Sequence, residues 1–497
     1  MVYVLGIDLG TSSLKGVLVD QEGKVVASEA SEYPLFSEKP GYSEQDPHCW
    51  IEAFEIVLNK LILAVPDMKR QLKGISFSGQ MHSLVLLDEN NEVLRKAILW
   101  NDVRTSKQCE EINKIMGSRL IEITGNIALE GFTLPKILWV QENEPHIWEK
   151  VAHLMLPKDY LAYWLTGNYS TDYSDGAGTL LLDIKEKQWS AEILQEFTIA
   201  KELLPELYES SECIGELSNH IREKFGFTES IPVFAGGADN ACAALGAGLT
   251  SPNVGLVSIG TSGVFLSNEE NADSNYRGKL HLFNAAMPDR YYSMGVTLSA
   301  GSSLSWFRNT FVKGQNFDEL LSEVGTVSPG AEGLLFTPYL VGERTPYADS
   351  LIRGSFIGLD ARHEMKHFSR AVLEGITFSL KDSQEMMKAA KKEPIEYLVS
   401  VGGGAKNPAW LQMQADIFDV PIHTLTTEQG PGLGAAILAA VGTGMFETFE
   451  DCVKKFVSYA SIYTPEIGSV EKYKKIYPIY QQVYSATKSI CHQLSEI

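Results

Sequence analysis

The sequence predicts an α/β protein that contains two related domains. A chain of 497 residues is too long for one ordinary hydrophobic core, so at least two domains are expected. Apolar β-branched runs alternate with helical patterns in both halves, which is typical of α/β folds. One strand–turn–strand pattern also occurs twice, in residues 7–13 and 257–263, with Gly-Thr-Ser at each turn. Because the flanking strands match too, the two copies indicate a repeated domain.

The first half begins with strands that are apolar and β-branched and that are separated by a glycine-containing turn at residues 20–23. Asp46 and Pro47 are a typical helix start, and apolar residues at helical spacing follow them. We expect strands over residues 2–7, 15–19, 24–28, 74–77 and 83–87, a helix that begins at Asp46-Pro47, and a second helix of small residues over 240–249.

The second half has the same character. Its repeated hairpin is expected over residues 254–267, and later strand and helix patterns follow it. We expect a long helix over residues 367–391, a strand over 397–401 and a helix that begins near Pro408. The boundary between the halves is placed after the small-residue helix, which gives domains of residues 1–247 and 248–497.

Charge and cysteine usage exclude several classes of protein. The net charge of −21 argues against nucleic acid or an anionic membrane as a partner, although a locally positive substrate pocket is compatible with it. The six cysteines are far apart and form no C-x-x-C pair, so neither a disulfide framework nor a thiolate zinc site is expected. No signal peptide and no apolar run near the ~20 residues of a membrane span are visible. These features predict a protein of the reducing cytoplasm.

The two repeated turns predict a polyphosphate site. A glycine followed by hydroxyl residues in a tight turn exposes backbone N–H groups in a concave nest that suits phosphate oxygens. One such turn alone is usually an ordinary hairpin, but two that face each other across a cleft would hold both ends of a polyphosphate. No P-loop motif is present. The candidate residues are Gly10, Thr11, Ser12, Ser13 and Lys15 at the first turn, and Gly260, Thr261 and Ser262 at the second.

Two aspartates accompany these turns. Asp8 precedes the first turn, where one carboxylate together with phosphate oxygens and water would suit Mg²⁺; the alternative is a turn cap. Asp239 follows the Gly236-Gly237 pair at the start of the small-residue helix. It is a candidate general base for a hydroxyl nucleophile, and the alternative is an ordinary helix N-cap.

Polar and aromatic residues in two loops predict a polyol pocket. Gln80, Met81 and His82 combine an amide, a soft apolar side chain and an imidazole, although His82 alone is more often a satisfied core histidine. Trp100 and Asn101 place an aromatic and an amide side chain next to each other. This combination is typical of the wall of a sugar pocket, and the alternative is a simple polar loop. A glycine run with Gly403, Gly404 and Ala405, followed by Asn407, lies between a strand and a helix and suits a flat adenine ring.

Together these motifs resemble the FGGY carbohydrate kinases of the actin/Hsp70-like ATPase superfamily. Two further stretches, residues 131–143 and 354–374, are similar to the diagnostic patterns of that family, and the resemblance covers essentially the whole chain. It implies two ribonuclease H-like domains, an active-site cleft between them, ATP and Mg²⁺ as cofactors and a small sugar as substrate. Dimers are common in the family, so a homodimer is expected by analogy.

The resemblance also implies roles for single residues. Asp239 corresponds to the family's proton acceptor, and Asp8 to the aspartate linked to metal and activity, with Asp239 beside the same metal. Met81 and His82 correspond to the sugar-binding pair, with Gln80, Trp100, Asn101 and Asn240 around it. Thr11, Thr261, Gly404 and Asn407 fall on nucleotide-binding positions.

The motifs are most similar to those of family members that phosphorylate D-xylulose to D-xylulose 5-phosphate. Ala238 and Ser83 replace glycines that are common in those members, so the exact sugar stays open. The alternatives within the family are gluconate, ribulose or a xylulose analogue as acceptor. Outside it, the alternatives are an ATP-dependent conformational protein without a small acceptor and a catalytically silent sugar-binding protein.

Overall fold

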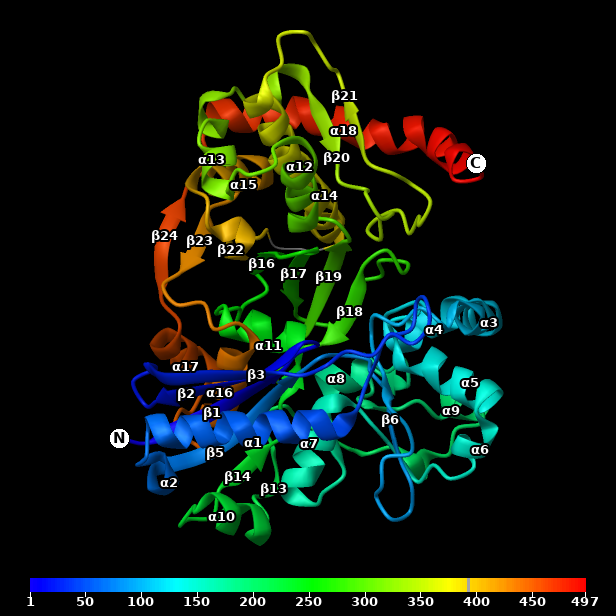
Figure 1. Ribbon diagram of the computed structural model, residues 1–497, viewed down its shortest axis with the longest axis vertical. Coiled ribbons are helices and arrows are strands. Elements are labelled where there is room, and N and C mark those ends of the chain that lie inside the picture. Colours follow the sequence, from blue (N-terminus) through cyan, green and yellow to red (C-terminus); the bar gives the residue numbers. More distant parts are fainter. Residues whose placement is uncertain (391–393) are drawn as a thin grey trace.

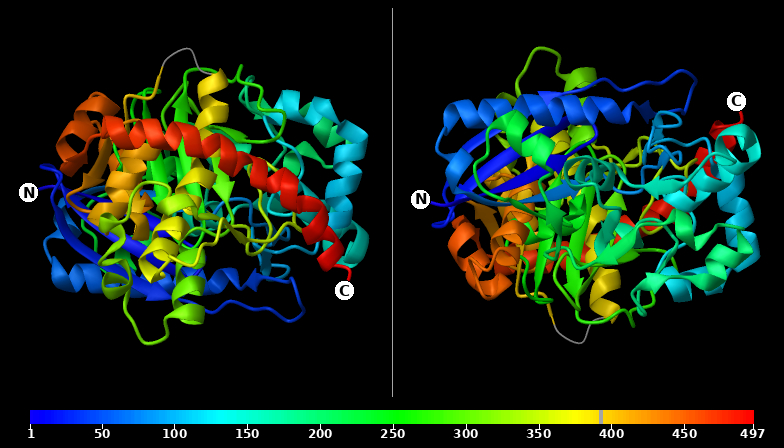
Figure 2. Two further views of the ribbon diagram at one scale, coloured as in Figure 1. Left: turned by 90° about the horizontal axis from the view of Figure 1, so that it is seen from above. Right: turned by 90° about the horizontal axis from the view of Figure 1, so that it is seen from below.

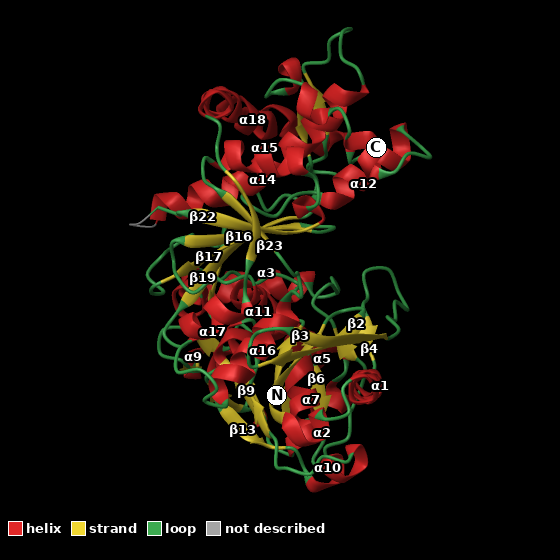
Figure 3. Ribbon diagram, turned by 90° about the vertical axis from the view of Figure 1, so that its left-hand side faces the viewer, coloured by secondary structure: helices red, strands yellow, loops and turns green. Residues whose placement is uncertain are grey.

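The computed structural model describes residues 1–390 and 394–497, and it has an α/β architecture with two large mixed sheets (Figure 1). Figure 3 shows one sheet with its helices in each half of the molecule, the second above the first. The predicted fold class, a two-domain α/β protein, is therefore confirmed. The division of the chain at residues 247 and 248 stays a prediction.

The first sheet has the strand order β13-β14-β5-β1-β2-β3, and β15 also pairs with β5. Its central strand β1 is antiparallel to β2 and parallel to β5. The strands are β1 (Tyr3–Leu9), β2 (Ser13–Asp20), β3 (Val25–Glu32), β5 (Leu72–Gly79), β13 (Cys213–Glu216), β14 (Pro232–Phe234) and β15 (Gly237–Ala238).

The second sheet has the strand order β18-β19-β17-β16-β22-β23-β24. Its strand β16 is antiparallel to β17 and parallel to β22. The strands are β16 (Val254–Ile259), β17 (Gly263–Glu269), β18 (His281–Asn284), β19 (Tyr291–Thr297), β22 (Tyr397–Gly402), β23 (Ile422–Leu425) and β24 (Tyr459–Tyr463).

The repeat that the sequence predicts is present in the backbone pairing. In both sheets the strand before the Gly-Thr-Ser turn pairs antiparallel with the strand after it and parallel with a strand from later in the chain. Gly10 N donates to Ser13 O at 3.0 Å in the first turn, and Gly260 N donates to Ser262 O at 3.0 Å in the second. Each turn therefore lies at the same place in its sheet.

Helices cover both sheets. In the first half they are α1 (Pro47–Ala64), α2 (Met68–Gln71), α3 (Ser106–Met116), α4 (Ser118–Thr124), α5 (Thr133–Asn143), α6 (Pro145–Trp148), α7 (Pro157–Thr166), α8 (Tyr173–Ala177), α9 (Ala191–Glu196), α10 (Asn219–Phe225) and α11 (Asp239–Gly246). In the second half they are α12 (Gly301–Phe311), α13 (Phe317–Leu321), α14 (Met365–Ala390), α15 (Pro408–Phe418), α16 (Pro431–Gly442), α17 (Phe449–Phe456) and α18 (Ile467–Leu494). Seen from above, α18 runs across the second half (Figure 2).

Five small two-stranded sheets complete the structure. They are formed by β4 (Glu44–Gln45) with β7 (Ala97–Ile98), β6 (Val85–Leu87) with β8 (His153–Met155), β9 (Ser170–Asp172) with β12 (Glu206–Tyr208), β10 (Leu182–Asp183) with β11 (Gln188–Trp189), and β20 (Leu335–Thr337) with β21 (Ser355–Ile357). None of the described helices is both long enough and apolar enough to cross a membrane.

One helix from the second half of the chain packs on the first sheet. Helix α16 contacts β1, β5 and α11, and Figure 1 shows α11 and α16 between the two sheets. The approach is close because small residues meet there: a Cβ atom added to Gly6 would lie 2.0 Å from Gly432 O, and one added to Gly434 would lie 2.0 Å from Cys242 O. The hydrophobic core accordingly runs without a break from the first sheet into the second.

The predicted elements differ from the observed ones mainly at their ends. β1 extends past Asp8, so this residue lies inside a strand, and its interpretation as a turn cap is wrong. Ala238 is the N-cap of α11 and Asp239 is the first helical residue, so the N-cap interpretation of Asp239 is also wrong. The predicted helix end at Lys391 lies outside the described residues.

Candidate active site

The two candidate carboxylates come together because they flank one strand. Asp8 of β1 and Gly237 of β15 both pair with Ser78 of β5, from its two sides. Since neighbouring strands lie about 4.8 Å apart, Asp8 and Gly237 are roughly 10 Å apart along the sheet, and Asp239 follows two residues later. The carboxyl ends of the parallel strands β1 and β5 therefore deliver Asp8, Asp239 and the loop after β5 to one edge of the sheet.

Both carboxylates are partly buried, and both hold protons more strongly than usual. Burial raises the pKa of Asp8 to about 6, although the charge of Lys15 acts in the opposite direction. Burial first, and the charge of Asp8 second, raise the pKa of Asp239 to about 7. The side chains of Asp8 and Asp239 are thus close enough for their charges to interact. Such a pair suits a proton acceptor or a cation.

The first Gly-Thr-Ser turn is held from two sides. Trp100 Nε1 donates to Thr11 Oγ1 at 2.8 Å, and Gln45 Nε2 donates to Thr11 O at 2.5 Å. Ser12 is exposed, and Gly10 and Ser13 are partly buried. Lys15 Nζ lies 3.5 Å from Gln429 O, and its charge acts on Asp8. Lys15 is thus a cation beside the acidic pair.

The loop after β5 places Gln80 and Met81 against the turn and the acidic pair. Gln80 Nε2 donates to Gly10 O at 3.3 Å, which joins this loop to the first Gly-Thr-Ser turn. Asn240 Nδ2 contacts Met81 Sδ at 3.8 Å, and Tyr292 Oη approaches the same sulfur at 3.8 Å from the second sheet. Met81 therefore lies directly beside the residue that follows Asp239.

His82 is held in a single orientation. Its backbone φ is 69°, in the left-handed region that few side chains other than glycine, asparagine, aspartate and histidine adopt. Its Nδ1 lies 2.6 Å from Gly178 O, and because a carbonyl only accepts, Nδ1 carries the proton. Burial lowers the pKa of His82 to about 3, so the ring is neutral and Nε2 is an acceptor. Phe132 packs on the ring at 4.7 Å between centroids.

Trp100 and Asn101 lie at the exposed rim. Trp100 is 43% exposed although its indole nitrogen is hydrogen-bonded to Thr11, and its backbone N–H donates to Ser83 Oγ at 3.1 Å. Asn101 is exposed. Trp100 thus links the predicted sugar wall to the first Gly-Thr-Ser turn.

A cavity of about 720 Å³ in the second half contains four of the predicted nucleotide residues, namely Gly260, Thr261, Gly403 and Asn407. Its size is typical of a cofactor pocket. Asn407 is also the N-cap of α15, with Oδ1 accepting from Trp410 N at 3.0 Å. Gly404 is buried, and neither it, Ser262 nor Ala405 lines this cavity.

Sequence reasoning missed the far wall of this cavity. That wall comes from α12 and α13 and the residues before α13, which carry no motif. The only local signal is the Asn316 N-cap with an apolar residue after it. The further lining residues are Ile259, Gly301, Ser302, Leu304, Ser305, Asn316, Phe317, Asp318, Leu321, Lys406 and Trp410.

Sequence reasoning also missed a buried charged cluster behind Asp239, formed by Lys158, Asp159, Asp172 and Asp175. Lys158 Nζ lies 2.6 Å from Asp159, 3.0 Å from Asp172 and 3.7 Å from Asp175. All four side chains are excluded from solvent. Burial alone disfavours the ammonium ion, but the three carboxylates outweigh it and raise the pKa of Lys158.

This buried charged cluster reaches the backbone that carries Asp239. Ser174 Oγ donates to Asp172 Oδ2 at 2.5 Å and accepts from Ala238 N at 3.0 Å. Asp172 in turn accepts from Ser210 Oγ at 2.8 Å, and Ser210 O accepts from Gly236 N at 2.9 Å. The turn from Gly236 to Ala238 is therefore hydrogen-bonded to the cluster on both sides.

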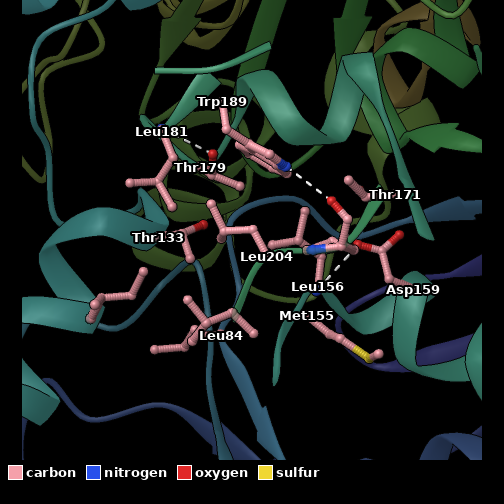
Figure 4. A pocket seen from close by; sticks show the side chains of 13 residues that line it. Leu84, Thr133, Met155, Leu156, Asp159, Thr171, Thr179, Leu181, Trp189 and Leu204 are labelled. Carbon is pink, nitrogen blue, oxygen red and sulfur yellow. Dashed lines mark hydrogen bonds between the residues drawn. The ribbon is translucent and has the colours of Figure 1, made fainter. Parts of the chain in front are cut away.

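A second, small cavity lies in the first half and is not part of this site (Figure 4). Its volume is about 20 Å³, which admits about one water molecule and no sugar. Figure 4 shows mostly aliphatic side chains around it, among them Leu84, Leu181 and Leu204, with Trp189 donating to a backbone carbonyl nearby.

Comparison with known proteins gives the family. The model of the FGGY family of carbohydrate kinases, N-terminal domain, matches residues 3–246, and the model of its C-terminal domain matches residues 255–443. The matched regions contain the two hairpins and both acidic residues.

Full-length relatives agree with these matches. Xylulose kinase of Lactococcus lactis subsp. lactis is 59% identical over 497 residues, which is 100% of this chain and 99% of that protein. Xylulose kinase of Bacillus subtilis is 51% identical over 490 residues, which is 99% of this chain and 98% of that protein. A crystal structure of ligand-bound xylulose kinase from Lactobacillus acidophilus has a TM-score of 0.94 at 28% identity and covers 99% of this chain and 100% of that one. The chain therefore belongs to the FGGY family of carbohydrate kinases.

Proposed function

We propose that this carbohydrate kinase transfers the γ-phosphoryl group of ATP to D-xylulose and produces D-xylulose 5-phosphate. The observation that carries the proposal is the contact between Asn240 and Met81, which sets the Met81–His82 pair beside Asp239. The high identity to xylulose kinases along the whole chain supports the same substrate. ATP is expected in the 720 Å³ cavity, with its phosphates directed toward the Gly-Thr-Ser turns.

The reaction is an in-line displacement. The oxygen of the sugar's C5 hydroxyl forms a bond to the γ-phosphorus while the bond from that phosphorus to the β,γ-bridging oxygen breaks, and ADP leaves with that electron pair. The hydroxyl proton passes to Asp239, whose raised pKa of about 7 makes it a stronger base than an exposed aspartate. Because the transition state of phosphoryl transfer is loose, orientation of the hydroxyl by Asp239 and of the phosphates by the two turns contributes most.

The acidic pair fits a magnesium ion. Mg²⁺ prefers one or two carboxylates together with phosphate oxygens and water, and Asp8 and Asp239 are two partly buried carboxylates whose charges interact. A bound Mg²⁺ supplies charge neutralisation for the transferring phosphoryl group. Asp8 would hold the ion directly or through water, and Lys15 would add positive charge on the same side.

Magnesium binding should release protons from the acidic pair. With pKa values of about 6 for Asp8 and about 7 for Asp239, both carboxyl groups are partly protonated near pH 6.5, and a divalent cation favours their ionised forms. We therefore expect the affinity for Mg²⁺ with ATP to rise between pH 5.5 and pH 7.5, with proton release that titration calorimetry in two buffers of different ionisation enthalpy would measure. The same release from Asp8→Asn as from the wild type would contradict this assignment.

Substitution of His82 tests the predicted sugar pocket. Replacing His82 by alanine removes the acceptor Nε2 and one wall of the pocket, so we expect the KM for D-xylulose to rise about 10-fold, as for the loss of one hydrogen bond, with the KM for ATP unchanged. His48→Ala, at an exposed histidine of α1, is the matched control. If the sugar KM of His82→Ala equals that of the control, the pocket is elsewhere.

A substrate panel separates the remaining alternatives. ADP release with D-xylulose, D-ribulose, gluconate and glycerol ranks the acceptors, and the highest kcat/KM is expected for D-xylulose. An ATP-dependent conformational protein would instead hydrolyse ATP slowly without stimulation by any sugar. A homodimer, which the family resemblance implies, stays a prediction.

A further inference from the structure

Arg344 lies on a loop of the second half that is tied firmly to β19. Thr345 N donates to Val296 O at 3.1 Å, and Val296 N donates to Thr345 Oγ1 at 3.1 Å. Glu343 Oε1 accepts from Leu298 N at 3.0 Å and from Arg344 N at 2.8 Å. The backbone of Arg344 is therefore held by bonds on both sides, which fixes where its side chain begins.

This loop lies where the second half meets the predicted sugar pocket. The neighbouring strand β18 carries His281, whose ring packs on Phe132 at 5.7 Å between centroids. Phe132 also packs on His82 of the predicted sugar pocket. The charge of Arg344 acts on both His82 and His281 and lowers the pKa of each further, after burial. Thr345 Oγ1 also donates to Lys279 O at 3.4 Å, two residues before His281, so the loop of Arg344 lies on the side of the pocket that the second half forms.

Arg344 has no protein partner there. It is only partly exposed, yet its guanidinium group makes no hydrogen bond or ion pair to any residue within 1–390 and 394–497. Two other arginines with little exposed side chain are paired with carboxylates: Arg104 forms ion pairs with Asp102 and Glu44, and Arg370 with Glu374. Because an unpaired, partly desolvated cation costs free energy, its presence beside a pocket indicates a ligand that supplies acceptors.

The position of Arg344 relative to Asp239 indicates which end of the sugar it would contact. Asn240 contacts Met81 on the Asp239 side of the Met81–His82 pair, whereas Phe132 joins His82 to His281 of β18, beside the loop that carries Arg344. A sugar whose C5 hydroxyl lies at Asp239 therefore presents its opposite end, C1 and C2, toward Arg344.

We propose that Arg344 binds the hydroxy-ketone end of the sugar, with its planar fork of N–H donors shared between the C2 carbonyl oxygen and the C1 hydroxyl oxygen. This inference rests on the proposed function, since it takes D-xylulose as the acceptor. Guanidinium groups donate in a fixed fork and accept nothing, and the carbonyl oxygen of a ketose is a pure acceptor, so the two match. The sugar would then contact the first half through His82 and the second half through Arg344.

The first test separates binding from folding. We expect Arg344→Met to raise the KM for D-xylulose about 10- to 100-fold, as for the loss of a hydrogen bond to a charged group. The KM for ATP should change little. Its melting temperature should equal or exceed that of the wild type, because an unpaired charge is removed. Arg353→Met is the matched control, since Arg353 is exposed on the same loop and, among the described residues, its side chain bonds only to the carbonyls of Ser350 and Ile352. An unchanged sugar KM, or a fall in melting temperature that accounts for the loss, would overturn the proposal.

The second test assigns the end of the sugar. In the wild type, 1-deoxy-D-xylulose lacks one of the two proposed acceptors, so Arg344→Met should weaken its kcat/KM several-fold less than it weakens that of D-xylulose. Equal losses for both sugars would place Arg344 away from C1 and overturn the assignment. Failure of the proposed function is distinct, because the wild type itself would then turn over D-xylulose no better than the other sugars of the panel.

Discussion

Replacement of Asp239 by asparagine is expected to lower kcat by at least about 10²-fold, the usual contribution of general base catalysis. Asparagine keeps the size of the side chain and the start of α11, but it cannot take up the proton of the attacking hydroxyl. The KM for D-xylulose should change less than kcat, since the amide still offers hydrogen bonds to the sugar. The measurement is steady-state ADP release with saturating ATP and varied sugar.

If Asp239 is the general base, the lower kcat of Asp239→Asn should not result from a loss of stability. A carboxyl whose pKa is raised by folding binds protons more tightly in the folded state, so its contribution to stability falls as the pH rises from about 4 to about 7. Removing the charge should therefore leave the melting temperature at pH 8 unchanged or higher. Asp273→Asn, at an exposed aspartate, is the control. Turnover of Asp239→Asn within a few-fold of that control would exclude Asp239 as the base.

The sequence alone predicted the structural elements that depend on local residue patterns. The Gly-Thr-Ser turns, the strands beside them and the helix after Asp46-Pro47 depend on neighbours within a few residues, and the structure contains them all. The likeness of the two hairpins also anticipated that both sheets share one pairing pattern. The observed ends of β1 and α11 differ from the predicted ones by one to three residues because tertiary hydrogen bonds, here to β5 and Ser174, decide where an element begins and ends.

Contacts between distant segments could not be predicted in this way. The cavity of about 720 Å³ needs α12 and α13, which lie far in sequence from the glycine run at residues 402–405. Arg344 acts on His82 across more than half of the chain, and no spacing rule joins them. The crossing of α16 onto the first sheet follows from the close approach of Gly432 to Gly6, which only the packed structure shows.

The buried charged cluster behind Asp239 is the other place where a large effect is expected. Replacing Lys158 by methionine should lower the free energy of unfolding by about 3–5 kcal/mol, because Asp159 and Asp172 would lose their cation while they stay excluded from solvent. Urea denaturation followed by circular dichroism measures this loss. The variant should also lose turnover at temperatures where it stays folded, since Asp172 bonds through Ser174 to the backbone before Asp239.

Asp175→Asn is the matched control within the same cluster. Asp175 lies 3.7 Å from Lys158, further than the other two carboxylates, and both of its carboxyl oxygens lack a hydrogen-bond partner among the described residues. Burial raises its pKa well above the usual value, against the opposing charge of Lys158, which favours the neutral carboxyl group. An isosteric amide should therefore change the free energy of unfolding by about 1 kcal/mol or less. If Asp175→Asn costs as much as Lys158→Met, then Asp175 is an ionised partner of Lys158, and the assignment of that role to Asp159 and Asp172 alone is wrong.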